Sequence, residues 1–321
     1  MKTTFRLLSV CLLMLVFLCG CNQTNPKETT ASPATEVTYP YDFTSEDFFY
    51  VKDFLSYDYI PMAKLDGVKA DGSFFDLPNF GGFTVMQGGC TDGKYCYLYL
   101  ADTDYNYEGQ SMECGMLFKV DMSNWQVVKQ SDPLPLSHGN GMCYNSKLNK
   151  IIVSYCNNYS HTPEDETKMV AFVDPETLTV AENKMVPMSI NAIDYNAKHD
   201  LYVVGIKGNS AAFAVLDLDD NGEFVELGYY DGHNIGLVSQ DVDCDDNYIY
   251  VGNSSVGTEH AGKEAVRVYD WDGEYKGIFL VQNMQEQEAL FNYGGKYYIT
   301  FFGGSGGRVY QINYDFSLLG E

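Results

Sequence analysis

A segment of about 50 residues recurs five times along this 321-residue chain, and the repetition constrains the fold more than any other feature. Each copy begins with a side-chain amide and continues into a β-prone run. Aligned on that amide, successive copies are separated by 53, 51, 49 and 47 residues. The five amides are Gln87, Asn140, Asn191, Gln240 and Gln287. Repeats of this period indicate a series of similar supersecondary units.

Each repeat predicts four short strands. The first begins at the amide, and the second is the most β-prone: "YCYLYL", "KIIVSY", "LYVVGI", "YIYVGN" and "YYITFF". The third ends at a polar residue that opens a turn: Asp121, Asp174, Asp217, Asp270 and Asn313. The fourth follows that turn: "WQVVKQ", "LTVAEN", "FVELGYY", "YKGIFL" and "FSLLG".

Four strands in each 50-residue repeat are typical of a β-propeller. The second strands are apolar on both alternating faces, as expected of a blade that is buried between two neighbours. Sandwiches and up-and-down barrels do not predict this recurrence. We therefore expect residues 81–321 to form an all-β, five-bladed β-propeller of four-stranded antiparallel blades. The repeats start near residues 85, 138, 189, 238 and 285.

Residues 1–20 have the layout of a secretory signal, with Lys2 and Arg6 before a short apolar run. The run ends in "LCGC", and a cysteine after a small residue resembles a bacterial lipobox. The resemblance implies that Cys21 carries a lipid and anchors the protein at the extracellular face of the bacterial cell membrane. An ordinary signal peptide or a membrane span is the alternative, but the run is shorter than the roughly 20 apolar residues of a span.

Residues 21–38 are rich in Thr, Pro, Ala and Ser, which predicts a flexible tether. Residues 39–80 lack the landmarks of the repeats. We expect them to form an N-terminal extension that packs on the ring, with a sixth blade as the alternative. Within them, "TSEDFFYVKDFL" suggests a short helix capped by Thr44 or Ser45.

The formal net charge of −24 at pH 7 disfavours nucleic acid and anionic lipid surfaces as partners. Solubility outside the cell explains this charge, and so does affinity for cations. Six cysteines follow Cys21: Cys90, Cys96, Cys114, Cys143, Cys156 and Cys244. Export would permit three disulfides. We favour reduced cysteines, because most of them lie in strand patterns where a thiol packs as a small apolar group.

In a propeller, the first strand of each blade lines the central channel, so the five amides are expected to form a ring near one mouth. They would either bind a ligand or bridge blade to blade. His138 and Glu286 precede their amides and could reach the same rim. We therefore predict ligand contacts at the amide ring and at these two residues.

The column that follows the amides breaks the symmetry of the repeats. It reads Gly88, Gly141, Ala192, Asp241 and Glu288. The small residues would leave room in the channel, and the two carboxylates would face that room. Amide oxygens with carboxylates match the oxygen shell that Ca²⁺ prefers. The alternative is a water-filled channel with solvated acids.

A second calcium candidate is "DTDYNYEGQSME". It places Asp102, Asp104, Asn106, Glu108 and Glu113 at the ligand positions of a calcium loop, but Tyr107 stands where a glycine is required. A solvated inter-strand loop is the alternative. Five loop tyrosines could stack on sugar rings or anchor a protein partner: Tyr105, Tyr107, Tyr159, Tyr229 and Tyr230.

The segments "QGGCTDGKYCYLYL", "HGNGMCYNSKLNKIIV", "VDCDDNYIYV" and "ALFNYGGKYYITF" resemble a propeller-like repeat family of secreted cell-wall proteins and lipoproteins of Gram-positive bacteria. The resemblance implies an extracellular repeat protein and brings no catalytic residues. We expect a binding module for a glycan, peptide or protein partner at the channel mouth, with or without a bound Ca²⁺.

The alternative function is a glycoside hydrolase or lyase that uses Asp241 with Glu288 or Glu286 as its two carboxyl groups. Gly88 and Gly141 count against it, since propeller glycosidases usually place an acid there. A third alternative is a scaffold whose channel binds nothing.

Overall fold

The structure is a computed structural model that describes residues 48–50, 83–157, 165–255, 264–281, 285–302, 307–312, 314 and 316–319. The chain divides into two compact units, Met1–Thr38 and Tyr39–Glu321, and all described residues belong to the second. The predicted signal, Cys21, the tether and most of the N-terminal extension lie outside the described residues.

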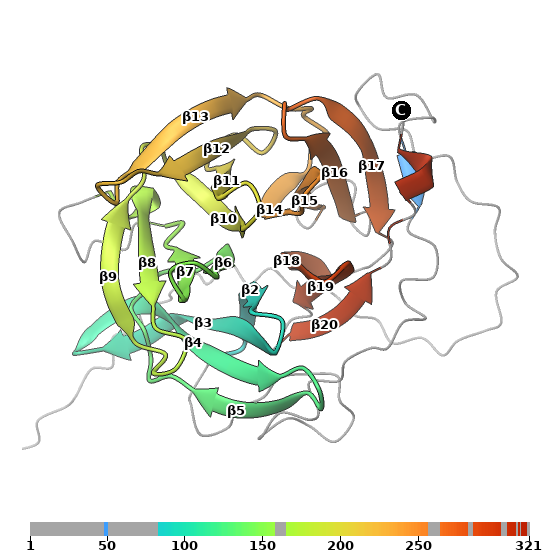
Figure 1. Ribbon diagram of the computed structural model, residues 1–321. Coiled ribbons are helices and arrows are strands. Elements are labelled where there is room, and N and C mark those ends of the chain that lie inside the picture. The colour runs from blue at the N-terminus through green and yellow to red at the C-terminus, as the bar shows by residue number, and fades with distance from the viewer. Residues whose placement is uncertain are drawn as a thin grey trace, which may run out of the picture. The chain divides into compact units, whose positions relative to one another are not determined.

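The described residues form five sheets arranged around a common centre, which confirms the predicted five-bladed β-propeller (Figure 1). Blade 1 contains β2 (Val85–Thr91), β3 (Tyr95–Tyr107), β4 (Gln110–Asp121) and β5 (Gln126–Gln130). Blade 2 contains β6 (Met142–Asn145), β7 (Lys150–Ser154), β8 (Met169–Val173) and β9 (Val180–Met185). Blade 3 contains β10 (Ile190–Asn196), β11 (Leu201–Ile206), β12 (Phe213–Leu218) and β13 (Phe224–Tyr230). Within each of these blades, successive strands pair antiparallel.

Blade 4 has its four predicted strands and one more. The four are β14 (Val238–Cys244), β15 (Tyr248–Ser254), β16 (Glu264–Asp270) and β17 (Tyr275–Val281). The extra strand, β1 (Phe48–Tyr50), pairs parallel with the outer strand β17. At Phe48–Tyr50 this strand replaces the helix expected over "TSEDFFYVKDFL", and the other residues of that segment lie outside the described ranges. An outer strand presents unpaired backbone groups, and an apolar, aromatic segment is suited to pair with them.

Blade 5 has three strands among the described residues: β18 (Glu286–Tyr293), β19 (Lys296–Phe302) and β20 (Gly307–Ile312). The fourth strand predicted in "FSLLG" is instead a 3₁₀-helix, Phe316–Leu318. Phe316 stacks on Tyr248 of blade 4, and Tyr314 packs 4.7 Å from Phe279. Packing against blade 4 thus overrides the β-propensity of this segment.

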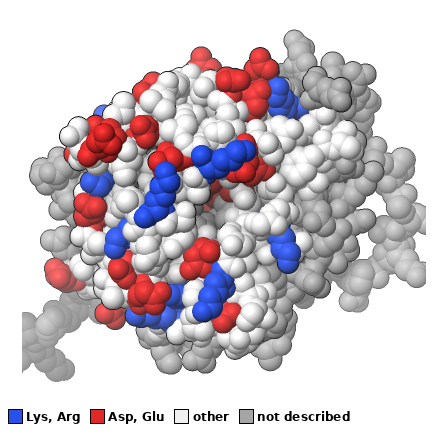
Figure 2. Space-filling view, in the orientation of Figure 1, with Lys and Arg blue, Asp and Glu red and all other residues white. Residues whose placement is uncertain are grey.

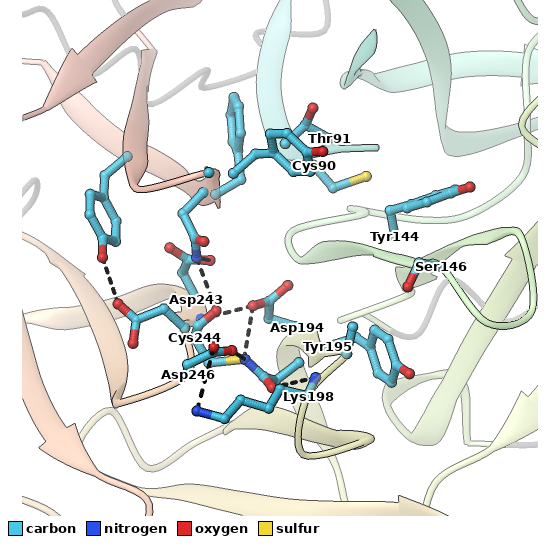
Figure 3. Close-up of a pocket in the computed structure, with 18 of the residues that line it drawn as sticks. Cys90, Thr91, Tyr144, Ser146, Asp194, Tyr195, Lys198, Asp243, Cys244 and Asp246 are labelled. Carbon is cyan, nitrogen blue, oxygen red and sulfur yellow. Dashed lines mark hydrogen bonds and ion pairs between the residues drawn. The ribbon is translucent and has the colours of Figure 1, made fainter. Parts of the chain in front are cut away.

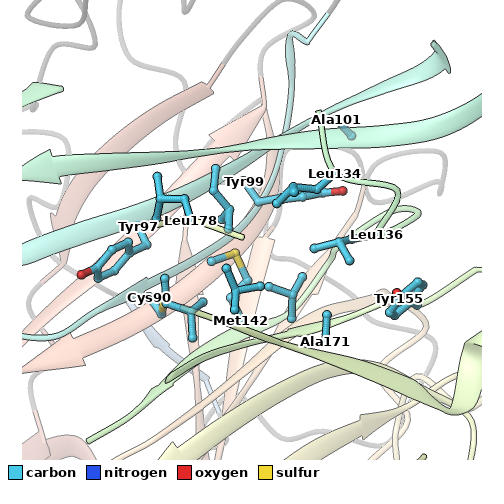
Figure 4. Close-up of a cluster of buried hydrophobic side chains, with 14 of the residues drawn as sticks. Cys90, Tyr97, Tyr99, Ala101, Leu134, Leu136, Met142, Tyr155, Ala171 and Leu178 are labelled. Carbon is cyan, nitrogen blue, oxygen red and sulfur yellow. The ribbon is translucent and has the colours of Figure 1, made fainter. Parts of the chain in front are cut away.

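The blades are held together by apolar clusters, one at each junction between neighbours. Figure 4 shows the junction of blades 1 and 2, where Tyr97 and Tyr99 pack with Met142. Blade 5 closes the ring on blade 1 through Phe291 and Tyr298. The second strands β7, β11 and β15 are buried on both faces, as predicted, whereas the outer strand β9 is largely exposed.

The predicted turn aspartates cap their hairpins in three of the four described repeats. The carboxylates of Asp121, Asp174 and Asp270 accept backbone N–H groups from the turn that follows each of them. In the third repeat this role falls to Asp219 and not to Asp217, because β12 extends to Leu218.

All six cysteines beyond Cys21 are buried and free, as favoured from the sequence. In the part of the chain that the structure describes, no helix has the length and apolar character of a membrane span.

Candidate functional site

The side-chain amides lie at irregular points of the inner strands. Between Ile190 and Ala192 the register of β10 shifts by one residue, which sets Asn191 in a bulge. Gln240 occupies the same position between Ser239 and Asp241 in β14. Register shifts also follow Met86 in β2 and Gln287 in β18. A bulge re-aims side chains out of the pleat, so the amides of these four strands mark where each strand bends. In blade 2, Asn140 lies before β6, which has a regular register.

One amide pair crosses the channel. Asn140 Nδ2 donates to the backbone oxygen of Gln240 at 3.1 Å and to its Oε1 at 3.3 Å. Inner strands of consecutive blades contact each other around the ring, so blade 2 and blade 4 are not neighbours. The contact therefore spans the axis and separates two ends of the channel. We call them the strand-start mouth, where the inner strands begin, and the strand-end mouth, where they finish.

The strand-start mouth gathers most of the site residues predicted from the sequence. His138 Nδ1 lies 2.5 Å from Oε1 of the fully buried Glu113. Gln240 Nε2 donates to Glu286 Oε1 at 2.6 Å. Burial raises the pKa of Glu286, and burial together with the charge of Glu286 raises that of Glu288 well above its usual value. The sequence had placed Glu113 in a different site.

The residues directly after the amides pack at the junctions between blades. They do not open the channel, contrary to prediction. A Cβ on Gly141 would lie 2.3 Å from Ala192 Cα in the next blade, and one on Gly88 would lie 2.6 Å from Met142 Cγ. Asp241 is fully buried, and its Oδ2 accepts the backbone N–H of Leu290 at 2.7 Å. Desolvation raises the pKa of Asp241 well above its usual value. Asp241 thus secures the bulge of the neighbouring inner strand.

The remaining amides, Gln87, Asn191 and Gln287, are buried, and the side chain of Asn191 bridges two blades. Asn191 Nδ2 donates to the backbone oxygen of Ser239 at 2.9 Å, across to blade 4. The backbone N–H of Gln287 donates to Glu264 Oε2 at 3.2 Å. Among the described residues, Gln87 Oε1, Asn140 Oδ1, Asn191 Oδ1 and both side-chain heteroatoms of Gln287 have no hydrogen-bond partner. The ring is therefore more than a set of inter-blade ties.

Neither predicted calcium site is assembled. Residues 102–113 do not form a loop but continue the long β3–β4 hairpin, which turns at Glu108 and Gly109. Asn106 Oδ1 accepts the N–H of Gly109 at the tip, far along the hairpin from the His138-bound Glu113. The Asp104 side chain lies outside the described residues, and Asp102 belongs to the paired ladder. Across the described ranges, no three His, Cys, Asp or Glu side chains are placed to hold a metal ion.

The strand-end mouth opens into a pocket of about 470 Å³ (Figure 3). It is formed by the ends of the inner strands and the turns that follow them. Its polar lining is acidic, and the lysine among its lining residues is Lys198. Its acids are Asp92, Asp194, Asp243, Asp245 and Asp246, and its aromatic side chains are Tyr144, Tyr195, Phe291, Tyr293 and Tyr297.

A pair of carboxyl groups forms the inner part of this pocket (Figure 3). Asp194 and Asp243, from blades 3 and 4, hydrogen-bond to each other. Asp194 Oδ2 also accepts the backbone N–H of Cys244 at 2.8 Å and its thiol at 3.0 Å. On the other side, Asp243 Oδ1 accepts Asn292 Nδ2 at 2.8 Å.

Both carboxyl groups hold a proton more tightly than an exposed aspartic acid does. Burial raises the pKa of Asp194 to about 6, and the hydrogen bonds from Cys244 oppose a larger rise. Burial and the neighbouring charge of Asp194 raise the pKa of Asp243 well above its usual value. The two carboxyl groups therefore titrate as a pair, which retains a proton more readily than isolated aspartic acids do.

The other acids of the pocket have local structural partners. Asp92 Oδ1 accepts two backbone N–H groups of its own turn. Asp245 Oδ2 accepts the hydroxyls of Tyr250 at 2.7 Å and Tyr297 at 2.6 Å. Asp246 lies 3.5 Å from Lys198. Asp194 and Asp243 differ from these acids because their partners lie across blade junctions and because they contact each other.

Sequence reasoning missed the Asp194–Asp243 pair, although the repeats contain its signal. The residues three places after the amides are Cys90, Cys143, Asp194, Asp243 and Leu290. This column changes from thiol to carboxylate at blades 3 and 4, where the pair lies. The residues directly after the amides include Asp241 and Glu288, so the sequence prediction placed the site at those two acids.

The tyrosines singled out in the sequence do not line this pocket. Tyr105 packs 4.9 Å from Phe83, and Tyr230 stacks 5.0 Å from Phe213. Tyr107 is near the hairpin tip, Tyr229 is exposed on β13, and Tyr159 lies outside the described residues.

No family model and no curated protein matches the chain. Among solved structures, it is similar to the glutaminyl cyclase of Myxococcus xanthus, at 12% identity over 72% of this chain and 90% of that one, with a TM-score of 0.46. It is also similar to a glucose dehydrogenase, at 10% identity over 73% and 83% of the two chains, with a TM-score of 0.44. A chain of a nidogen/laminin complex matches at 10% identity over 71% and 74%, with a TM-score of 0.40. Function has to be argued from the site itself.

Proposed function

We propose that this protein is a lipid-anchored extracellular binding module whose ligand inserts a cationic group into the strand-end pocket. The observation that supports this most directly is the Asp194–Asp243 pair inside a 470 Å³ pocket. That volume lies within the range of small-ligand sites, roughly 300–1,000 Å³.

The pocket chemistry favours an ammonium or guanidinium group. Asp194 accepts hydrogen bonds from Cys244, so its oxygens act as acceptors at the pocket, and a cationic donor adds charge to such a bond. The lysine of the lining, Lys198, already has Asp246 beside it. The tyrosines around the rim provide faces for apolar or sugar-ring parts of the ligand. The ligand is accordingly a glycan, peptide or protein segment with a free amine or guanidinium group.

Binding fits these carboxyl groups better than glycoside hydrolysis does. The two carboxyl groups of a glycosidase stand roughly 5–10 Å apart, whereas Asp194 and Asp243 are in direct hydrogen-bond contact. Asp241, one of the acids considered for catalysis, is buried against Leu290.

The anchoring part of the proposal is supported by the signal-like residues 1–20, by Cys21 and by the resemblance of the repeats to those of Gram-positive surface proteins. Cells that express the chain should incorporate labelled fatty acid into it. A Cys21→Ser variant should lose the label and leave the membrane fraction. Labelling that persists in this variant would remove the anchor from the proposal.

The binding part is tested by calorimetric titration of the lipid-free Cys21→Ser chain with amines and their acetylated counterparts, such as glucosamine with N-acetylglucosamine and lysine peptides with acetylated ones. We expect binding of the free amines and at least tenfold weaker binding of the acetylated forms. Asp194→Asn should weaken amine binding by a similar factor, since one charge-assisted hydrogen bond is worth about 1.5–3 kcal/mol. Asp220→Asn is the matched control, because Asp220 is exposed on a hairpin of blade 3. Equal affinity for free and acetylated ligands would contradict the proposal.

A further inference from the structure

A second hollow adjoins the strand-end pocket. It has a volume of about 540 Å³ and lies at the junction of blades 5 and 1, between the turns after β2, β4 and β18. The two hollows share Tyr293 and Gly294 as lining residues. They therefore adjoin on the same face of the ring, with one exposed aromatic side chain between them.

Tyr293 is held in place although more than half of it is exposed. Its exposed fraction is 55%, and its ring lies directly over Gly93 in the first turn of blade 1. A Cβ on Gly93 would stand 2.2 Å from Tyr293 Cζ, and the φ of +89° at Gly93 also disfavours any other residue. The absence of a side chain at Gly93 thus lets the Tyr293 ring cross from blade 5 to blade 1 and form a platform.

The two hollows differ in charge. The strand-end pocket contains the Asp194–Asp243 pair, whereas Lys94 and Lys296 line the second hollow with a single acid, Asp121. Asp121 is engaged locally, because its Oδ1 accepts the backbone N–H and hydroxyl of Ser123 at 2.9 and 2.6 Å. In Figure 2, basic and acidic side chains lie interspersed on the described part of one face of the molecule. A ligand that spans both hollows would meet negative charge at one end and positive charge at the other.

We propose that the two hollows form one groove for a short peptide. Its ammonium group lies at Asp194, its backbone crosses Tyr293, and its carboxylate lies between Lys94 and Lys296. This inference rests on the proposed function, because it uses the same acidic pocket for the amine. It adds that the ligand is zwitterionic and extended. A carboxylate held by two lysines and an ammonium held by a carboxylate select such a molecule by charge and by length.

The experiment is calorimetric titration of the lipid-free chain at pH 7 with tri-, tetra- and pentaglycine. Each peptide is used in three forms: free, N-acetylated and C-terminally amidated. We expect the free form to bind best, at one preferred length. Amidation should weaken binding about fivefold, the effect of losing one or two exposed ion pairs. A Lys94→Ala/Lys296→Ala variant should bind the free and amidated forms equally. Lys129→Ala is the matched control, because Lys129 lies on the outer strand β5.

The outcomes separate this inference from the proposed function. If acetylation abolishes binding while amidation and the double lysine substitution leave it unchanged, the acidic pocket binds amines and the peptide groove is wrong. If no form of any peptide binds, the groove is wrong and the amine panel decides the proposed function. If amidation weakens binding equally in the wild type and the double variant, the carboxylate is recognised elsewhere and the assignment of Lys94 and Lys296 fails.

Discussion

The two mouths of the channel contain buried carboxyl groups with similar inter-blade hydrogen bonds but with different surroundings. At the strand-start side, Asp241 accepts a backbone N–H of the next blade, and Glu113 is bound to His138, so these acids tie the ring together. At the strand-end side, Asp194 accepts the backbone N–H of Cys244 in the next blade, and Asp243 accepts the side-chain amide of Asn292. These two carboxyl groups also contact each other, at the inner end of an open pocket. The comparison teaches that a buried carboxyl group does not by itself mark a binding site. What distinguishes the second pair is that it borders a space that a ligand can enter.

The largest effect that tests this contrast is on stability. Asp241→Ala should lower the free energy of unfolding by about 2–3 kcal/mol, because it leaves the Leu290 N–H buried without its acceptor and opens a small cavity. Chemical denaturation measures the change, with Asp220→Ala as the control. The same variant should keep its affinity for amines. Unchanged stability would remove Asp241 from the tie between blades 4 and 5.

Substitution of Asp194, at the strand-end mouth, should raise the free energy of unfolding at pH 7, whereas substitution of Asp241 lowers it. The pKa of Asp194 rises from 3.8 to about 6, so the native state binds a proton more tightly than the unfolded chain does. Stability should therefore fall by roughly 2 kcal/mol as pH rises from about 4 to 6. Asp194→Asn should lose much of this dependence and be more stable than the wild type at pH 7, while it loses amine binding.

Denaturation curves at pH 4, 5, 6 and 7 for both proteins measure this effect. A wild type whose stability rises through that interval would show that Asp194 is stabilised as a carboxylate. The proposed difference between the two mouths would then be wrong for the strand-end pocket. Asp220→Asn should follow the wild-type pH profile, because its side chain is exposed.

Much of the fold could be predicted from the sequence, because local and long-range signals agree. The amide columns, the β-prone second strands and most of the turn aspartates point to the same blade in each repeat. The prediction failed where packing between blades decides the structure. Phe316 stacks on an aromatic side chain of blade 4, and β1 pairs with the edge strand β17. Neither contact can be predicted from the sequence of its own segment, because the partner lies far away in the chain.

The site was harder to predict because the direction of a side chain depends on the bulges. One inserted residue turns Gln240 toward Asn140 and leaves Asp241 between blades, and no spacing in a single sequence shows where the insertion falls. Asp194 and Asp243 lie beyond the bulge, where the alternation is regular. Regular alternation places these two positions on the same face of their strands, so their column could be predicted from the sequence.

The smallest predicted effect concerns the platform between the two hollows. Tyr293→Ala should weaken peptide binding about threefold to tenfold, because it removes an aromatic face from the middle of the groove. Tyr293→Phe should keep most of the affinity if the ring face makes the contact. Neither change should lower the melting temperature much, since the side chain is 55% exposed. Calorimetric titration and thermal unfolding of both variants measure these effects. A loss of affinity in Tyr293→Phe as large as in Tyr293→Ala would mean that the hydroxyl is recognised, and the ligand would then be held at this point by a hydrogen bond and not by stacking.

His138→Ala, at the opposite mouth, should leave peptide affinity unchanged, because the Asn140–Gln240 contact lies between that residue and the groove.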